Sequence, residues 1–209
     1  KSKLHIVTLK AHKYIDNNYT TYFKVLIVLN TFGLFIHCNV DKKLNTNIFS
    51  YNESTSINTL DPHFVKSQSE NWVVTQLNAG LVQLDTLLQP KSMIADSWQV
   101  SNDGLTYTFF LNKGVYFHAW ENHGPRSVSA FDVLYSFNRL MNPSTASPGT
   151  WVFSDKIDSV TPFRAIDSFT FSLRLKQAFP PLIGILSMPY CYVIPKEAVE
   201  FYGKDFRSH

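Results

Sequence analysis

Cysteine is scarce in this sequence, and the two that occur, Cys38 and Cys191, lie far apart. That separation gives no metal-ligand spacing, so a zinc site built on cysteine pairs is excluded. If Cys38 carries a lipid, no disulfide can form within the chain. We then expect Cys191, in the segment MPYCYVIPK, to be a small buried hydrophobic residue.

Common catalytic motifs are also missing. The chain contains no G-x-S-x-G elbow, no Walker loop and no G-x-G-x-x-G stretch. The segment FHAWENH brings His118, Glu121 and His123 close together and raises the question of a metal or catalytic site. It is not the His-Glu-x-x-His helix of a zinc hydrolase, because these residues follow a strand end and enter a turn. We expect His118 to be structural and hydrogen-bonded at a sheet edge, with a metal site or solvent exposure as alternatives.

An excess of charge is absent from most of the chain. The formal net charge is +3, but the residues before Cys38 carry five lysines against Asp16 alone. The remainder is therefore almost neutral, with no basic stripe for a phosphate backbone. Nucleic acid is not an expected partner.

No apolar run is long enough to span a membrane comfortably. Residues Val25 to Ile36 form a short apolar stretch interrupted by Asn30 and Gly33. A basic segment before such a stretch is typical of an export signal, here residues 1–38. Cys38 follows it directly and is placed like the lipidated first residue of bacterial lipoproteins, although His37 departs from the small residue usual there. The alternative is a buried element with an incidental thiol.

The rest of the chain predicts alternating strands and helices. Residues 49–57 look extended, Ser69 is a candidate helix N-cap with Glu70 in the first turn, and the helix runs through Leu77. A strand LVQLD follows. Three further strands, Trp98 to Val100, Thr106 to Leu111 and Val115 to His118, are joined by Gly-containing turns and predict an antiparallel meander.

Two amphipathic patterns mark the second half. Ser129 and Asp132 have the spacing of a capping box, and the helix they open has an apolar stripe of Val133, Phe137 and Leu140. Residues 169–176 alternate strictly between apolar and polar, which predicts a half-buried strand. A Pro-broken apolar stretch and a short helix ending near Gly203 complete the chain.

These residues carry a resemblance to a known family. The segments LDPH, GLVQLD, IADSWQVSNDGLTYTFFLNKGVYFH, SAFDVLYSFNRLMNPSTASPG and VIPKEAVEFYGKDF occur in the order and spacing of bacterial extracellular solute-binding proteins of family 5. These are the oligopeptide and dipeptide receptors of ABC importers. The resemblance covers about residues 59–209. It departs locally, because FHAWENHG stands where FHDG is usual, and Phe131 stands where an acidic residue is common.

The resemblance implies a mixed α/β (α+β) fold of the periplasmic-binding-protein class II type, whose two lobes close on the ligand. It places the start of lobe one at residues 39–84, an inserted β-rich subdomain at 85–185 and a return to lobe one at 186–209. The second lobe would be absent, so the chain is expected to be an N-terminal fragment that binds peptide negligibly alone.

The resemblance also implies a role and a site. The chain would capture peptides for an ABC importer, bind no cofactor or metal, catalyse no reaction, and act as a lipid-anchored monomer on the periplasmic side beside permease subunits. Lys66, Ser67 and Gln68 would line the cleft, and the TASPG turn would approach the ligand. Gly149 stands where an aromatic is frequent, which suggests a differently filled pocket with Trp151 as a substitute.

Alternatives remain for the function and for single residues. The same fold could bind a metal chelate, haem or a sugar. A secreted hydrolase using Asp61 and Glu70 is more remote, because Asp61 before Pro62 is a natural turn former that bonds its own backbone. Lys66 could also be an ordinary solvated lysine.

Overall fold

The main sheet is antiparallel and has four strands in the order β3-β4-β8-β7, with β3 at Ala95–Val100, β4 at Thr106–Leu111, β7 at Phe163–Ala165 and β8 at Thr170–Arg174. The computed structural model describes residues 52–209. The predicted export signal, Cys38 and the start of the extended segment 49–57 lie outside them, and residues 52–57 form no strand.

Two small hairpins accompany this sheet. Strands β1 (Val82–Leu84) and β2 (Pro90–Ser92) pair with each other, as do β5 (Tyr116–Phe117) and β6 (Arg126–Ser127). The predicted three-stranded meander is therefore wrong in its last strand. The β3–β4 hairpin forms as expected, but β4 takes β8 as its second neighbour, and β5 turns away to pair with β6.

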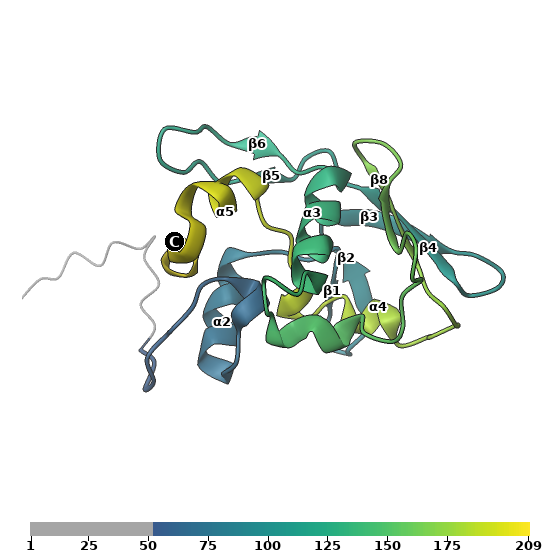
Figure 1. The fold of residues 1–209 in the computed structure, drawn as a ribbon, viewed down its shortest axis with the longest axis horizontal. Coiled ribbons are helices and arrows are strands. Elements are labelled where there is room, and N and C mark those ends of the chain that lie inside the picture. The colour runs from purple at the N-terminus through teal and green to yellow at the C-terminus, as the bar shows by residue number, and fades with distance from the viewer. Residues whose placement is uncertain (1–51) are drawn as a thin grey trace, which may run out of the picture. The chain divides into compact units, whose positions relative to one another are not determined.

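Helix α3 (Ala130–Met141) packs on β7 and β8. Figure 1 shows α3 beside the labelled strands of the main sheet. The capping box of Ser129 and Asp132 is present, and the predicted stripe of Val133, Phe137 and Leu140 is fully buried. Burial of such a stripe is what holds a helix of this length on a sheet. The sequence expectation for this helix is confirmed.

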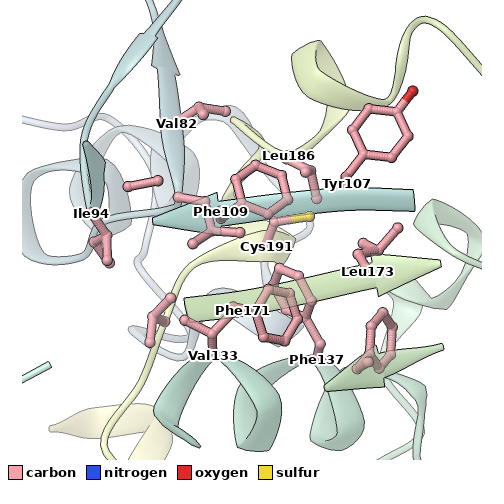
Figure 2. Packing of buried hydrophobic residues seen from close by; sticks show 14 of the residues in the cluster. Val82, Ile94, Tyr107, Phe109, Val133, Phe137, Phe171, Leu173, Leu186 and Cys191 are labelled. Atoms are coloured by element: carbon pink, nitrogen blue, oxygen red, sulfur yellow. The ribbon is translucent and has the colours of Figure 1, made fainter. Parts of the chain in front are cut away.

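The core lies between this helix and the sheet. Phe109 of β4, Phe171 of β8 and Phe137 of α3 point toward one another in Figure 2. Phe137 meets Phe171 edge-to-face with ring centroids 5.5 Å apart, an arrangement that aromatic pairs favour. Cys191 is buried in the same cluster, and burial raises the pKa of its thiol, so it behaves as the expected hydrophobic residue.

Three further helices and four 3-10 turns connect these parts. The helices are α2 (Gln68–Leu77), α4 (Leu182–Ile185) and α5 (Lys196–Tyr202), and the turns are η1 (Pro62–Phe64), η2 (Pro148–Val152), η3 (Pro189–Cys191) and η4 (Gly203–Ser208). Gly203 has a φ of 55°, which suits glycine and ends α5 where the sequence predicted.

Residues Glu53–His209 form one compact unit. Its principal core draws on the predicted lobe-one segments through Val82 and Val193 and on the predicted subdomain through Phe109. The division at residues 85 and 185 stays a prediction. In the described part of the chain, no helix is long and apolar enough to cross a membrane.

Candidate functional site

The predicted binding loop lies at the start of α2, and Lys66, Ser67 and Gln68 are all exposed there. Ser67, not Ser69, is the helix N-cap: the Glu70 N–H donates to Ser67 Oγ at 3.2 Å, and Glu70 Oε2 accepts from the Ser67 N–H at 3.1 Å. The S-x-x-E spacing of a capping box was the signal that should have selected Ser67. Ser69 instead is buried and accepts a hydrogen bond from Thr55 Oγ1.

Glu70 fixes the backbone of this loop. Its carboxylate also accepts the N–H groups of Lys66 at 2.8 Å and Asn58 at 3.3 Å. Burial alone would raise the pKa of the Glu70 carboxyl, but these hydrogen bonds hold the pKa below its ordinary value. The loop therefore presents its side chains on a backbone held by a buried anion.

The turn at Gly149 is attached to the same region. Ser147 caps η2 by accepting the Gly149 N–H at 3.0 Å, and its own hydroxyl donates to the carbonyl of His63 in η1. Gly149 itself is buried, whereas 47% of Trp151 is exposed. Of the two residues proposed from this turn, only Trp151 offers a side chain to a ligand.

Tyr190, which sequence reasoning missed, joins the loop to the turn. Its hydroxyl donates to the carbonyl of Val65 at 2.7 Å, directly before Lys66. Its ring packs on Gly149 and meets the Trp151 ring at 83° with centroids 6.4 Å apart. The space at Gly149 is thus filled by a ring from a segment distant in sequence. No local pattern around Pro189 distinguishes this tyrosine.

A buried ion pair lies behind the loop. Arg139 of α3 donates to both oxygens of Asp61, at 2.6 and 3.1 Å, and to His63 Nδ1 at 2.8 Å. Asp61 also accepts the His63 N–H at 3.0 Å, so the expected turn role is confirmed. Burial lowers the pKa of His63 to about 4. This network anchors η1 on α3.

The histidine segment that raised the metal question does not form the expected sheet-edge contact. His118 is exposed and forms no hydrogen bond in the part of the chain that the structure describes, so the prediction of a hydrogen-bonded His118 is wrong. His123 instead stacks on Trp120 with centroids 4.1 Å apart, and Glu121 accepts the Tyr202 hydroxyl at 2.9 Å. Within residues 52–209 no group of three His, Cys, Asp or Glu side chains is placed to hold a metal ion.

The site offers binding groups. The loop carries the Lys66 ammonium, the Ser67 hydroxyl and the Gln68 amide. The turn carries the Trp151 indole. The Ser67 hydroxyl oxygen accepts a hydrogen bond from the Glu70 N–H, and the Glu70 carboxylate accepts hydrogen bonds from backbone N–H groups. This pair is therefore a helix cap. A nucleophile needs a base to accept its proton, and Glu70 is not placed as one for Ser67.

Known proteins resemble this chain over most of the described residues. The glutathione-binding protein GsiB of Salmonella choleraesuis is 30% identical over 155 residues, which is 74% of this chain and 28% of that protein. The ABC transporter-associated periplasmic binding protein DppA of Helicobacter pylori, solved in complex with the peptide STSA, is 29% identical with a TM-score of 0.62 over 71% of this chain and 31% of its own.

A third relative was solved with a different ligand. MoaA of A. tumefaciens R10, in complex with mannopinic acid, is 26% identical with a TM-score of 0.63 and covers 72% of this chain and 30% of its own. The chain thus spans about 30% of the length of each of these relatives. The family described as "Bacterial extracellular solute-binding proteins, family 5 Middle" matches residues 89–209, more than half of the chain. This chain belongs to the family 5 bacterial extracellular solute-binding proteins, with the mixed α/β fold of the periplasmic oligopeptide-binding proteins.

Proposed function

We propose that this chain forms part of the substrate receptor of an ABC importer and that it captures short peptides. The observation that carries the proposal is the convergence of the Lys66–Gln68 loop and the Gly149–Trp151 turn at Tyr190. Exposed polar groups beside an aromatic surface suit ligands that share a backbone and differ in their side chains. Relatives named for glutathione and solved with a peptide support the same ligand class.

Membership of the family supports a proposed location and proposed partners. A receptor of this kind works on the periplasmic side of the membrane and delivers its ligand to permease subunits. We propose that it is a monomer tethered through a lipid on Cys38, and that neither nucleic acid nor a metal cofactor takes part. The nearly neutral charge after Cys38 agrees with a peptide ligand more than with a polyanion.

A different small solute is the second candidate. The likeness to MoaA, solved with mannopinic acid, favours it. A hydrolase is less well supported, because Asp61 is paired with Arg139 and Glu70 is bonded to the backbone of its own loop. Neither carboxylate has the free oxygen that a general base presents to water.

Ligand titration followed by NMR tests the proposal on the chain as it is. Tetra-alanine and mannopinic acid are titrated separately into the 209-residue chain labelled with ¹⁵N. We expect tetra-alanine to shift the amides of Lys66 to Gln68 and the indole N–H of Trp151. Binding should be weak, on the order of 1 mM and so negligible at micromolar peptide as the sequence predicts, because one wall leaves most of a ligand in water. The indole of Trp120, which stacks on His123, is the internal control.

The outcomes separate the candidates. Shifts with tetra-alanine at Lys66 to Gln68 and Trp151 support the peptide receptor. Shifts at these positions with mannopinic acid alone would favour the second candidate. Shifts confined to Trp120, or no shift at tens of millimolar peptide, would refute a peptide site at this loop. Cleavage of the peptide during the titration would overturn the receptor proposal altogether.

A further inference from the structure

Trp151 and Tyr190 form an aromatic corner beside the proposed binding loop. Their rings are nearly perpendicular, and 47% of Trp151 is exposed while Tyr190 is half-buried. A perpendicular pair can offer a third ring both a stacking face and an edge-to-face contact. We propose that this corner is a subsite for an aromatic or apolar side chain of the ligand, that the Trp151 and Tyr190 rings together select that side chain, and that the Tyr190 hydroxyl holds the binding loop beside them. This inference rests on the proposed peptide-receptor function.

Gly149 sets the position of the Tyr190 ring. A Cβ added at Gly149 would lie 2.4 Å from Cδ1, 2.5 Å from Cγ and 2.9 Å from Cβ of Tyr190. Cβ and Cγ of Tyr190 do not move when the ring rotates about the bond between them, so this rotation cannot relieve the overlap. Any side chain at position 149 must therefore displace Tyr190 from the corner. Glycine at 149 and tyrosine at 190 act as one sterically coupled pair.

The Tyr190 hydroxyl has a task distinct from that of its ring. It donates to the Val65 carbonyl at 2.7 Å, and Lys66, the first exposed residue of the loop, follows directly. The ring contributes the apolar surface, and the hydroxyl holds the loop against it. Removing the hydroxyl should affect every peptide alike, whereas removing an aromatic surface should change which peptide is preferred.

Phenylalanine-scanned tetrapeptides measure the preference. Tetra-alanine and four variants with a single Phe at each position are titrated into the full chain, and dissociation constants are read from the Lys66 to Gln68 amides. We expect one Phe peptide to bind about 3 to 10 times more tightly than tetra-alanine, the range that an aromatic contact gives. The Trp151→Ala variant should bring this ratio to about 1.

Two tyrosine variants separate the ring from the hydroxyl. Tyr190→Phe should weaken all five peptides by a similar factor and keep the preference. Tyr192→Phe is the matched control, because Tyr192 is a buried neighbour whose hydroxyl bonds Thr75 at 3.3 Å and not the Val65 carbonyl. It should keep the wild-type constants. A preference lost in Tyr190→Phe but kept in Trp151→Ala would overturn the division of tasks.

The steric pair can be tested without any ligand. Gly149→Ala should lower the folding equilibrium constant by roughly 5-fold to 150-fold, the usual range for overpacking. In a Tyr190→Gly background the same change should cost less than about 2-fold, since all three overlapping atoms of Tyr190 are gone. Gly184→Ala is the control, because a Cβ there meets nothing within 4 Å. Equal losses at Gly149 in both backgrounds would refute the coupling.

The two proposals fail in different ways. Wild-type chain that binds all five peptides equally would overturn the aromatic subsite and leave the peptide receptor standing. Wild-type chain that binds no peptide would overturn both. A preference for Phe that survives Trp151→Ala would show that the indole does not select the side chain and would overturn the two-ring subsite.

Discussion

Arg139 holds the Asp61 carboxylate through two hydrogen bonds, Nη2 to Oδ2 at 2.6 Å and Nη1 to Oδ1 at 3.1 Å, across 78 positions of sequence. The Asp61 side chain is 1% exposed and that of Arg139 13% exposed, so the pair is almost fully withdrawn from water. Asp61 begins η1, which leads into the Lys66 loop, and Arg139 lies in the last turn of α3. The pair therefore fixes the loop of the proposed site on the helix that covers the core.

Removing the arginine should destabilise the chain strongly. Arg139→Ala leaves a buried carboxylate without its cation, and such a loss typically costs about 3 to 5 kcal/mol in the free energy of unfolding. Arg139→Lys keeps the charge but not the two parallel hydrogen bonds, so its cost should be intermediate. Urea unfolding followed by circular dichroism measures both.

An exposed ion pair supplies the control. Arg174 lies 3.8 Å from Asp158, with side chains 52% and 31% exposed, and Arg174→Ala should cost less than about 1 kcal/mol. If Arg139→Ala proved no more costly than Arg174→Ala, the buried pair would have no special role in holding η1.

Local structure was largely predictable from the sequence, and the reason is that its signals are local. The stripe of Val133, Phe137 and Leu140 and the alternation around Phe171 both follow from the repeat of one element. The resemblance to a family supplied the positions of Lys66 and Trp151, which the structure brings to the same region through Tyr190.

The rest depended on contacts between distant segments. Strand β5 pairs with β6 and not with β4. A strand of only two residues, Tyr116 and Phe117, is too short to show an alternation of apolar and polar residues, so the sequence does not indicate its partner strand. The contact of Tyr190 with Gly149 and the pairing of Asp61 with Arg139 are likewise long-range. Composition predicts that such residues are buried or paired, but only the fold decides with which partner.

The proposed lipid anchor can be tested at Cys38, which lies outside the described residues. Cys38→Ser removes the only thiol placed for acylation after the apolar stretch, so the variant should lose its lipid and its membrane association. Fractionation of expressing cells, with mass spectrometry of the processed chain, measures both. Cys191→Ser is the control, because the Cys191 thiol is buried in the core. Membrane retention of Cys38→Ser equal to that of the wild type would refute the anchor.

The buried His63 should make the chain sensitive to mild acid. Burial is the largest cause of its low pKa. Arg139 lowers it further, and the opposing attraction of Asp61 is smaller than the effect of burial. Nδ1 accepts a hydrogen bond from Arg139, so the neutral ring carries its proton on Nε2. A second proton would have to occupy Nδ1, facing a guanidinium inside the protein.

The sign of the effect follows from the two pKa values of His63. The ordinary value is 6.5 and the folded value is about 4, so between these values the unfolded chain binds more protons. The contribution of the neutral His63 to the free energy of unfolding is complete above pH 6.5 and is lost as the pH falls toward 4. Between pH 7.5 and pH 5 the free energy of unfolding should fall by about 2 kcal/mol because of this histidine. Urea unfolding at the two pH values measures the loss.

Substitution isolates the histidine from other acid-sensitive groups. His63→Asn places an amide oxygen near the position of Nδ1, so Arg139 keeps an acceptor while the titrating ring is removed. Whatever its effect on stability at pH 7.5, this variant should lose about 2 kcal/mol less than the wild type on going to pH 5. His118→Asn, at an exposed histidine, should keep the wild-type loss. An undiminished loss in His63→Asn would assign the acid sensitivity to other groups and show that the buried ring is not its cause.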